Sequence, residues 1–231
     1  MATLDFSTLL RGDHLAALAT SLVTMVEVTG LAWLLAMAVG VVLALARMSP
    51  SVWLQRAVAA YVEYHQNVPM LVQIFLWYFG IATFLPKDLQ QWLNRHGSEF
   101  FFAVVSIGLA MGAYVSEALR SGIRSIPASQ LEAARALGLG YFQSFQLVVL
   151  PQALRIALPA LISHSVLLFK NTSLAMAIGV AELTYVTREI ENETFRTVEI
   201  YLVATAIYLA FSLAIMAAGS AIERRTRTVA R

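Results

Sequence analysis

Long apolar segments constrain this chain more than any other feature. Residues 21–46 contain a single charged side chain, Glu27. At about 1.5 Å of rise per residue, a helix over this segment is long enough to cross a bilayer core of roughly 30 Å. Charged residues make up only 13% of the chain, whereas a soluble domain has about a quarter. The chain is therefore predicted to be an integral membrane protein.

Four further apolar segments resemble the first, so we predict an all-α integral membrane protein with one transmembrane domain, residues 1–231. The five expected transmembrane helices cover residues 21–46, 68–85, 100–120, 151–170 and 198–222. An amphipathic segment, 52–65, precedes the second span. The polar residues 170–173 are expected to break the fourth span, with a helical continuation over 174–183. Segments 86–99 and 184–196 are expected to be polar loops.

Basic residues are distributed unevenly between the loops, which predicts the orientation of the chain, because cytoplasmic loops carry an excess of Lys and Arg. Ten arginines fall on one side of a five-span protein: Arg47, Arg56, Arg120, Arg124, Arg135, Arg155, Arg224, Arg225, Arg227 and Arg231. Five basic residues fall on the other side: Arg11, Lys87, Arg95, Arg188 and Arg196. The N-terminus is therefore expected outside, and the C-terminus and segment 125–150 in the cytoplasm.

The cytoplasmic segment 125–150 has the pattern of a short docking helix. Ser129 and Glu132 have the spacing of a capping box, which predicts a helix over 130–137 that ends at Gly138. Its apolar face is expected to hold Leu131, Ala134 and Leu137. Periodicity alone is equally typical of an interfacial helix that lies between two spans.

The residues EAARALGLGYFQSFQLVVLP in this segment resemble the EAA loop in the membrane subunits of ABC importers. The family pattern is E-A-A, three residues, G, nine residues, I, one residue and L-P. The matching positions are Glu132, Ala133, Ala134, Gly138, Val148 in the isoleucine position, Leu150 and Pro151. The resemblance implies the transmembrane domain of a MetI-like, type I importer in the bacterial inner membrane. It also implies that this helix inserts into a separate ATPase and transmits that subunit's closing motion to the spans.

The chain lacks the residues that ATP hydrolysis requires. A phosphate-binding loop needs Gly-Lys followed by Ser or Thr, but Pro86 precedes Lys87 and Phe169 precedes Lys170. There is no cysteine, and the four histidines do not have metal-ligand spacing, so no cofactor or metal is expected in this chain. The resemblance implies these partners: two ATP-binding subunits that bind ATP and Mg²⁺, a second permease chain (identical or similar) and a soluble substrate-binding protein outside. No nucleic-acid partner is expected, because the arginines lie at span ends.

A second segment, Tyr61 to Gly80, resembles polar amino-acid permeases. Its family pattern is Y-V-E, two residues, R, then N-V-P or G-T-P, then L-L-V-Q. The matches are Tyr61-Val62-Glu63, Asn67-Val68-Pro69 and Leu71-Val72-Gln73, with Gln66 where the family usually has arginine. The form of the motif is most similar to the glutamate/aspartate permeases. It implies import of a polar amino acid, with a preference for acidic ones.

Polar side chains in the fourth span are candidates for the substrate path. His164 and Asn171 are seven residues apart and share a helix face, and Ser163 and Thr172 lie beside them. The resemblance implies that this region lines the path, where His164 and Asn171 would help to select an acidic or amide amino acid. A lone histidine in a span can also be a packed, hydrogen-bonded residue. Nearer the cytoplasm, Glu117 is expected to pair with a neighbouring arginine.

Two other functions remain open on the sequence alone. A stand-alone, ion-coupled secondary transporter of amino acids would be expected to show internal repeats, and residues 1–115 and 116–231 do not resemble each other. A membrane scaffold without transport activity would not need polar residues at the break in the fourth span. Both are weaker explanations than an importer permease.

Overall fold

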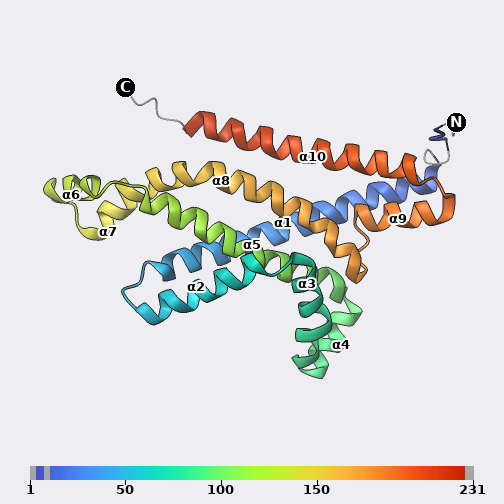
Figure 1. Ribbon diagram of the computed structural model, residues 1–231, viewed down its shortest axis with the longest axis horizontal. Coiled ribbons are helices and arrows are strands. Elements are labelled where there is room, and N and C mark those ends of the chain that lie inside the picture. The colour runs from blue at the N-terminus through green and yellow to red at the C-terminus, as the bar shows by residue number, and fades with distance from the viewer. Residues whose placement is uncertain (1–3, 8–10, 227–231) are drawn as a thin grey trace.

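The computed structural model describes residues 4–7 and 11–226, which form an elongated bundle of helices without a strand in that part of the chain (Figure 1). Its α-helices are α1 (Gly12–Arg47), α2 (Val52–Asn67), α3 (Met70–Phe75), α4 (Lys87–Arg95), α5 (Ser98–Arg124), α6 (Ala128–Ala136), α7 (Tyr141–Ser144), α8 (Leu150–Asn171), α9 (Leu183–Thr194) and α10 (Thr197–Thr226). Two π-helical turns, Leu76–Gly80 and Phe145–Val149, and two 3₁₀ segments, Ile81–Phe84 and Thr172–Ile178, complete the described elements.

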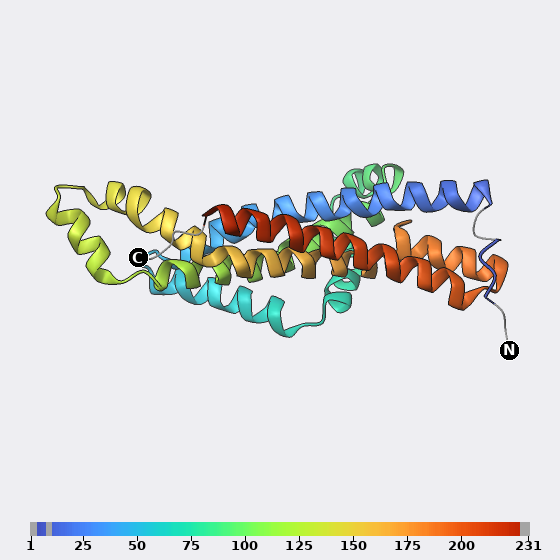
Figure 2. The same cartoon turned by 90° about the horizontal axis from the view of Figure 1, so that it is seen from above.

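Long helices run parallel to the long axis of the molecule, as Figures 1 and 2 show from two directions. The described residues contain four uninterrupted helices that are long and apolar enough to cross a membrane: Gly12–Arg47, Ser98–Arg124, Tyr141–Ile178 and Thr197–Thr226. The second predicted span, residues 68–85, is instead part of a pair of helical segments, Val52–Asn67 and Met70–Phe84, that is bent by 110°. The first span begins at Gly12, before the predicted start at residue 21.

The bend between α2 and α3 is stabilised by one buried side chain. Val68 and Pro69 are extended and interrupt the helix. The Gln73 amide nitrogen donates to the carbonyl oxygens of His65 and Val68 at 3.1 and 2.7 Å, and its oxygen lies 2.5 Å from His65 Nδ1. Gln73 is only 1% exposed. It therefore satisfies backbone groups that a broken helix would otherwise leave without partners, which is costly in a membrane.

Replacing Gln73 with Leu is expected to destabilise the protein by about 3 kcal/mol, because it leaves buried carbonyls unsatisfied. Thermal unfolding of the purified protein in detergent measures the loss. The matched control is Gln66→Leu, since Gln66 is exposed at the end of α2, on the other side of the same bend. Equal melting temperatures for the two variants would contradict this role of Gln73.

Two of the predicted polar loops are helices. Residues 86–99 contain α4, which follows Pro86 and buries Leu93. Residues 184–196 contain most of α9, which buries Leu183, Val186 and Ile190 on one face. The Glu182 carboxylate caps α9 by accepting from the backbone N–H groups of Thr184 and Tyr185. The loop predictions were wrong because a short amphipathic helix with a few buried apolar residues has a low average hydropathy.

The helices α1 and α5 pack closely enough that their backbones nearly touch. A Cβ atom on Gly112 would lie 2.7 Å from Val39 Cγ1, and one on Gly108 would lie 2.7 Å from Leu35 Cδ2. On the opposite helix, a Cβ on Gly40 would lie 2.4 Å from Val115 Cγ1. Small residues at three levels thus allow the close approach by which membrane helices associate.

Gly112→Ala is expected to lower the stability of the protein by about 1–3 kcal/mol, because the added methyl group overpacks this contact. Gly30→Ala is the control, since a Cβ at Gly30 has no atom within 4 Å. Thermal unfolding in detergent measures the melting temperature of each variant. If Gly112→Ala melts at the same temperature as Gly30→Ala, the close contact between α1 and α5 does not limit the size of the residue at position 112.

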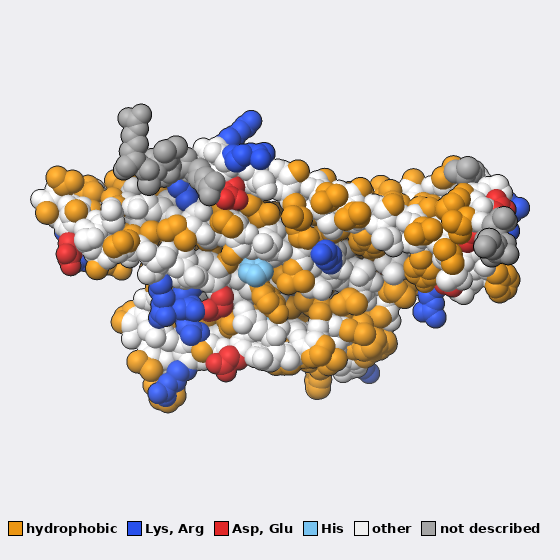
Figure 3. Space-filling model, turned by 45° about the horizontal axis from the view of Figure 1, so that its top comes forward, with side chains coloured by type: hydrophobic (Ala, Val, Ile, Leu, Met, Phe, Trp, Pro, Cys, Tyr) orange, Lys and Arg blue, Asp and Glu red, His pale blue; other side chains and the backbone are white. Residues whose placement is uncertain are grey.

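The fourth span is longer and less regular than predicted. Helical structure continues from Tyr141 through a π-helical turn into α8, so Pro151 lies within a longer run and not at its start. After Asn171 the chain tightens into a 3₁₀ segment that ends at Gly179, whose φ of +93° is left-handed. The predicted continuation to residue 183 is therefore too long. A space-filling view shows that hydrophobic side chains cover much of the middle of the molecule, while several basic groups lie nearer its ends (Figure 3).

Candidate functional site

A projecting pair of short helices, α6 and α7, forms one end of the molecule (Figures 1 and 2). α6 begins after Pro127, so Ser129 lies inside its first turn and no side chain caps it. The predicted capping box is therefore wrong. The physical reason is that proline, with φ fixed near −58°, begins the helix two residues earlier.

The end of α6 follows the sequence prediction. Gly138 has a φ of +84°, and its N–H donates to the Arg135 carbonyl at 2.9 Å. The next N–H, from Leu139, donates to the Ala134 carbonyl at 3.2 Å. These two bonds form a Schellman motif, which requires a left-handed residue at the glycine position.

The projecting end exposes large apolar side chains. Of the predicted apolar face, Ala134 is buried and Leu131 is half-buried, but Leu137 is 84% exposed because it lies beyond the last helical residue. Glu132 and Ala133 are exposed as well. The other exposed apolar side chains between α6 and α8 are Tyr141, Phe142 and Leu147. Apolar groups concentrated at a tip outside the bundle are typical of a protein-binding surface.

A continuous helical path connects this tip to the bundle. Leu150 is half-buried and, with Leu45 and Leu119, lines a small apolar cavity of about 80 Å³ between the first residues of α8 and the ends of α1 and α5. Pro151 is exposed on the outer face of α8. The π-helical turn before Leu150 accommodates the missing N–H of proline without ending the helix. Displacement of the tip would therefore move α8 with it.

Two of the four predicted path residues lie together against α5. The ring centroids of His164 and Tyr114 are 5.5 Å apart. The Asn171 amide nitrogen lies 3.7 Å from the Met111 sulfur. Both side chains are half-buried, so they can still contact a solute.

The other two predicted residues are placed differently. Ser163 donates to the Pro159 carbonyl and lines a groove toward α10 with Met216. Thr172 is fully buried and donates to the Phe169 carbonyl. Ser163 therefore faces α10, and Thr172 is not accessible to a solute. Tyr114 and Met111 were not predicted, because aromatic and apolar residues three apart on a helix are indistinguishable from packing residues.

Glu117 pairs with Arg120 on α5, as the spacing predicts. The Arg120 Nε donates to Glu117 Oε2 at 2.9 Å. Both side chains are only partly exposed. The pair lies one helical turn beyond Tyr114, toward the end of α5 that leads to the projecting helices.

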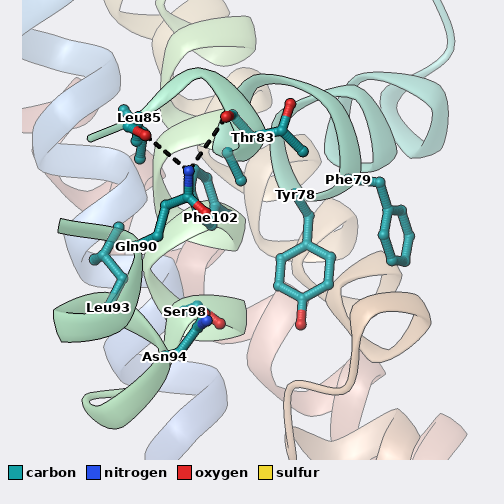
Figure 4. Close-up of a pocket in the computed structure, with 10 residues that line it drawn as sticks. Tyr78, Phe79, Thr83, Leu85, Gln90, Leu93, Asn94, Ser98 and Phe102 are labelled. Carbon is teal, nitrogen blue, oxygen red and sulfur yellow. Dashed lines mark hydrogen bonds between the residues drawn. The ribbon is translucent and has the colours of Figure 1, made fainter. Parts of the chain in front are cut away.

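A separate pocket of about 370 Å³ lies between the 3₁₀ segment Ile81–Phe84, α4 and α5. In Figure 4, Tyr78 and Phe79 lie on one side of it, and Gln90 and Asn94 lie on the other. Gln90 donates to the carbonyls of Thr83 and Leu85 (dashed lines in Figure 4), which ties α4 to the bent span. The predicted path residues do not line this pocket.

The fold is that of a helical protein with several helices long and apolar enough to cross a membrane, and with a pair of short helices that projects from one end of the bundle. Residues 36–228 match the family described as "binding-protein-dependent transport system inner membrane component". The chain belongs to this family, and so is a permease component of an ABC importer. This confirms the membrane class and the predicted family.

Relatives and solved structures agree with the family. The nopaline transport system permease protein NocM of Agrobacterium fabrum is 38% identical over 76% of this chain and 73% of its own length. The glutamate/aspartate import permease protein GltK of Escherichia coli is 31% identical over 98% of this chain and all of its own. A crystal structure of an amino acid ABC transporter with histidines has a TM-score of 0.84 at 29% identity, over 97% of this chain and all of that one. The MetNI methionine ABC transporter, at 15% identity and a TM-score of 0.73, shows the same fold over 95% of this chain and all of its own.

The relatives are permease proteins, so this chain is a transport subunit and not itself an enzyme. The family assignment replaces the alternatives of a stand-alone secondary transporter and a scaffold. Permease components of this kind work with ATPase partners.

Proposed function

We propose that this chain imports polar amino acids, with a preference for glutamate or aspartate, and that separate ATPase subunits drive it from the α6–α7 tip. The exposed apolar tip, joined to α8 by continuous helix, is the observation that carries the proposal. A motion applied to the tip would reach His164 and Asn171 through α8 itself, because the same helix holds them.

The substrate preference is supported by chemistry and by a relative. His164 and Asn171 are hydrogen-bonding groups that can donate to a carboxylate, and they lie together on the α5 side of α8. The similarity to the glutamate/aspartate permease extends over almost the whole chain. The nopaline permease has a higher sequence identity, but over a shorter part of the chain.

The proposed assembly has two ATP-binding subunits, a second permease chain (identical or similar) and a soluble binding protein outside. ATP and Mg²⁺ bind to the ATPase subunits. The C-terminal end of α10 points toward the same end of the molecule as α6 and α7, in agreement with the charge bias (Figure 1). We place that end in the cytoplasm and the N-terminus outside. Two arginines of the bias, Arg227 and Arg231, lie outside the described residues.

Gly138→Ala is expected to weaken binding of the ATPase about tenfold, because a left-handed alanine costs about 1–2 kcal/mol and distorts the end of α6. Co-purification and the affinity of the isolated ATPase measure the effect. Gly140→Ala is the matched control, since Gly140 has an ordinary φ of −66°. If both variants bind the ATPase like the wild type, the tip is not the docking site.

His164→Leu is expected to lower glutamate uptake by reconstituted vesicles about tenfold, as the loss of one hydrogen bond to a charged group would. Because the site would lose its donor, uptake of uncharged amino acids should fall less. His96→Leu is the control, since His96 is exposed at the end of α4. An unchanged rate and substrate profile would remove His164 from the path.

A further inference from the structure

Two grooves along α10 adjoin each other and have no role in the functions above. The first, of about 560 Å³, is lined by residues of α8, α9 and α10, and the second, of about 360 Å³, by residues of α8 and α10. Val166 and Met216 line both of them. The two therefore form one continuous depression, which we call the α8–α10 groove.

Lys170 lines this groove at the middle of the membrane. The contacts of its two neighbours give its depth. Phe169 stacks on Phe211 with 5.9 Å between ring centroids, and Phe211 is halfway along α10. Asn171 contacts Met111, which is halfway along α5. Both membrane interfaces are therefore roughly 15 Å from this level, which is half the thickness of a bilayer core.

A lysine at this depth is incompatible with a surface that faces lipid. Lys170 is exposed, and no ion pair among residues 4–7 and 11–226 includes it. Figure 3 shows a basic side chain near the middle of the molecule, apart from those nearer its ends. Charged side chains inside a membrane are costly, and they almost always face a water-filled cavity or another part of the protein. The surface around Lys170 is therefore covered by water or protein in the assembled importer.

Polar side chains occur along the whole groove. Thr187, Tyr201, Thr205 and Ser212 line its first part, and Ser163, Ser220 and Glu223 line its second part. From Tyr201 to Glu223 the groove follows α10 for about 33 Å, at 1.5 Å per residue. This length is close to the thickness of a bilayer core, about 30 Å. A polar depression that crosses the core is typical of a path for a polar solute.

The described acids of this chain leave the charge of Lys170 uncompensated. Glu223 is the only carboxylate among the residues that line the groove, and it lies ten residues beyond Leu213 on α10, about 15 Å away along the helix. Glu182 accepts hydrogen bonds from two backbone N–H groups and from the Tyr208 hydroxyl. Apolar side chains such as Leu209 and Leu213 also line the groove around its middle, and an apolar surrounding strengthens the attraction of a lysine for an anion.

We propose that the α8–α10 groove is part of the substrate path and that Lys170 binds the α-carboxylate of the amino acid halfway across the membrane. The inference rests on the proposed function, since it takes the substrate to be an amino acid, and every amino acid carries this carboxylate whatever its side chain. The hydroxyl groups of Thr187 and Thr205 donate to backbone carbonyls, so their oxygens can accept from the α-ammonium group. Selection of the side chain is left to His164 and Asn171.

The first test measures whether position 170 meets water. A Lys170→Cys variant of the intact importer complex in nanodiscs is treated with a cationic, membrane-impermeant thiosulfonate, and mass spectrometry of the permease chain gives the rate of modification. We expect a rate at least about tenfold higher than for Leu34→Cys, because a charged reagent does not enter lipid. Leu34 is an exposed apolar residue of α1 at a similar depth, since its neighbour Leu35 packs at Gly108 of α5. The natural chain has no cysteine, so only the introduced thiol reacts.

The second test measures uptake by proteoliposomes that contain the complete importer. Lys170→Gln is expected to lower the uptake rates of glutamate and of glutamine by the same factor, about tenfold, because both lose one charge-assisted hydrogen bond. Lys170→Arg keeps the charge and should retain most of the uptake. The matched control is Lys87→Gln, which removes the only other lysine, outside the groove. Thermal unfolding confirms that each variant folds.

Three results would overturn the proposal. Equal modification rates for the two cysteine variants would show that the groove does not face water. Unchanged uptake by Lys170→Gln, or a loss that Lys170→Arg does not restore, would remove the charge from the path. A loss confined to glutamate would show that Lys170 binds a side-chain carboxylate instead. If the wild type imports neither amino acid, the proposed function itself is wrong, and the modification rates still decide whether the groove faces water.

Discussion

The close contact between α1 and α5 is the interaction on which the rest of the structure depends. Gly40, Gly108 and Gly112 remove the side chains that would hold these helices apart. Apolar burial supplies little force between helices in a membrane, because lipid is as apolar as the side chains, so close packing must supply it. α5 then forms the surface against which α8 places His164 and Asn171.

Wherever the chain departs from a regular helix, a particular group forms hydrogen bonds with the backbone N–H or C=O groups that the helix no longer pairs. Gln73 supplies hydrogen bonds at the 110° bend, and the Schellman bonds around Gly138 supply them at the end of α6. Glu182 does the same at the start of α9. These hydrogen bonds allow the bundle to bend and to end its helices without leaving backbone groups unsatisfied.

The projecting tip and the residues His164 and Asn171 belong to one continuous helical element. α8 connects the projecting end to His164 without a flexible loop, and Leu150 packs near α1 and α5 where the element enters the bundle. α8 thus places His164 and Asn171 against α5, whereas Ser163, although next to His164 in the sequence, lines a groove toward α10.

The amino-acid sequence by itself determined the membrane class, the approximate spans, the left-handed Gly138 and the family, because hydropathy, glycine conformation and motif spacing are local properties. It did not determine that residues 184–196 form a helix, that Pro127 displaces the predicted cap, or that the second span is bent. Those features depend on which side chains become buried: Ile190 packs in the core, and Gln73 reaches back across the bend. The tertiary structure alone decided that His164 and Asn171 face α5, that Ser163 faces α10 and that Thr172 is buried, because neighbours along a helix point in different directions and only packing selects what each of them meets.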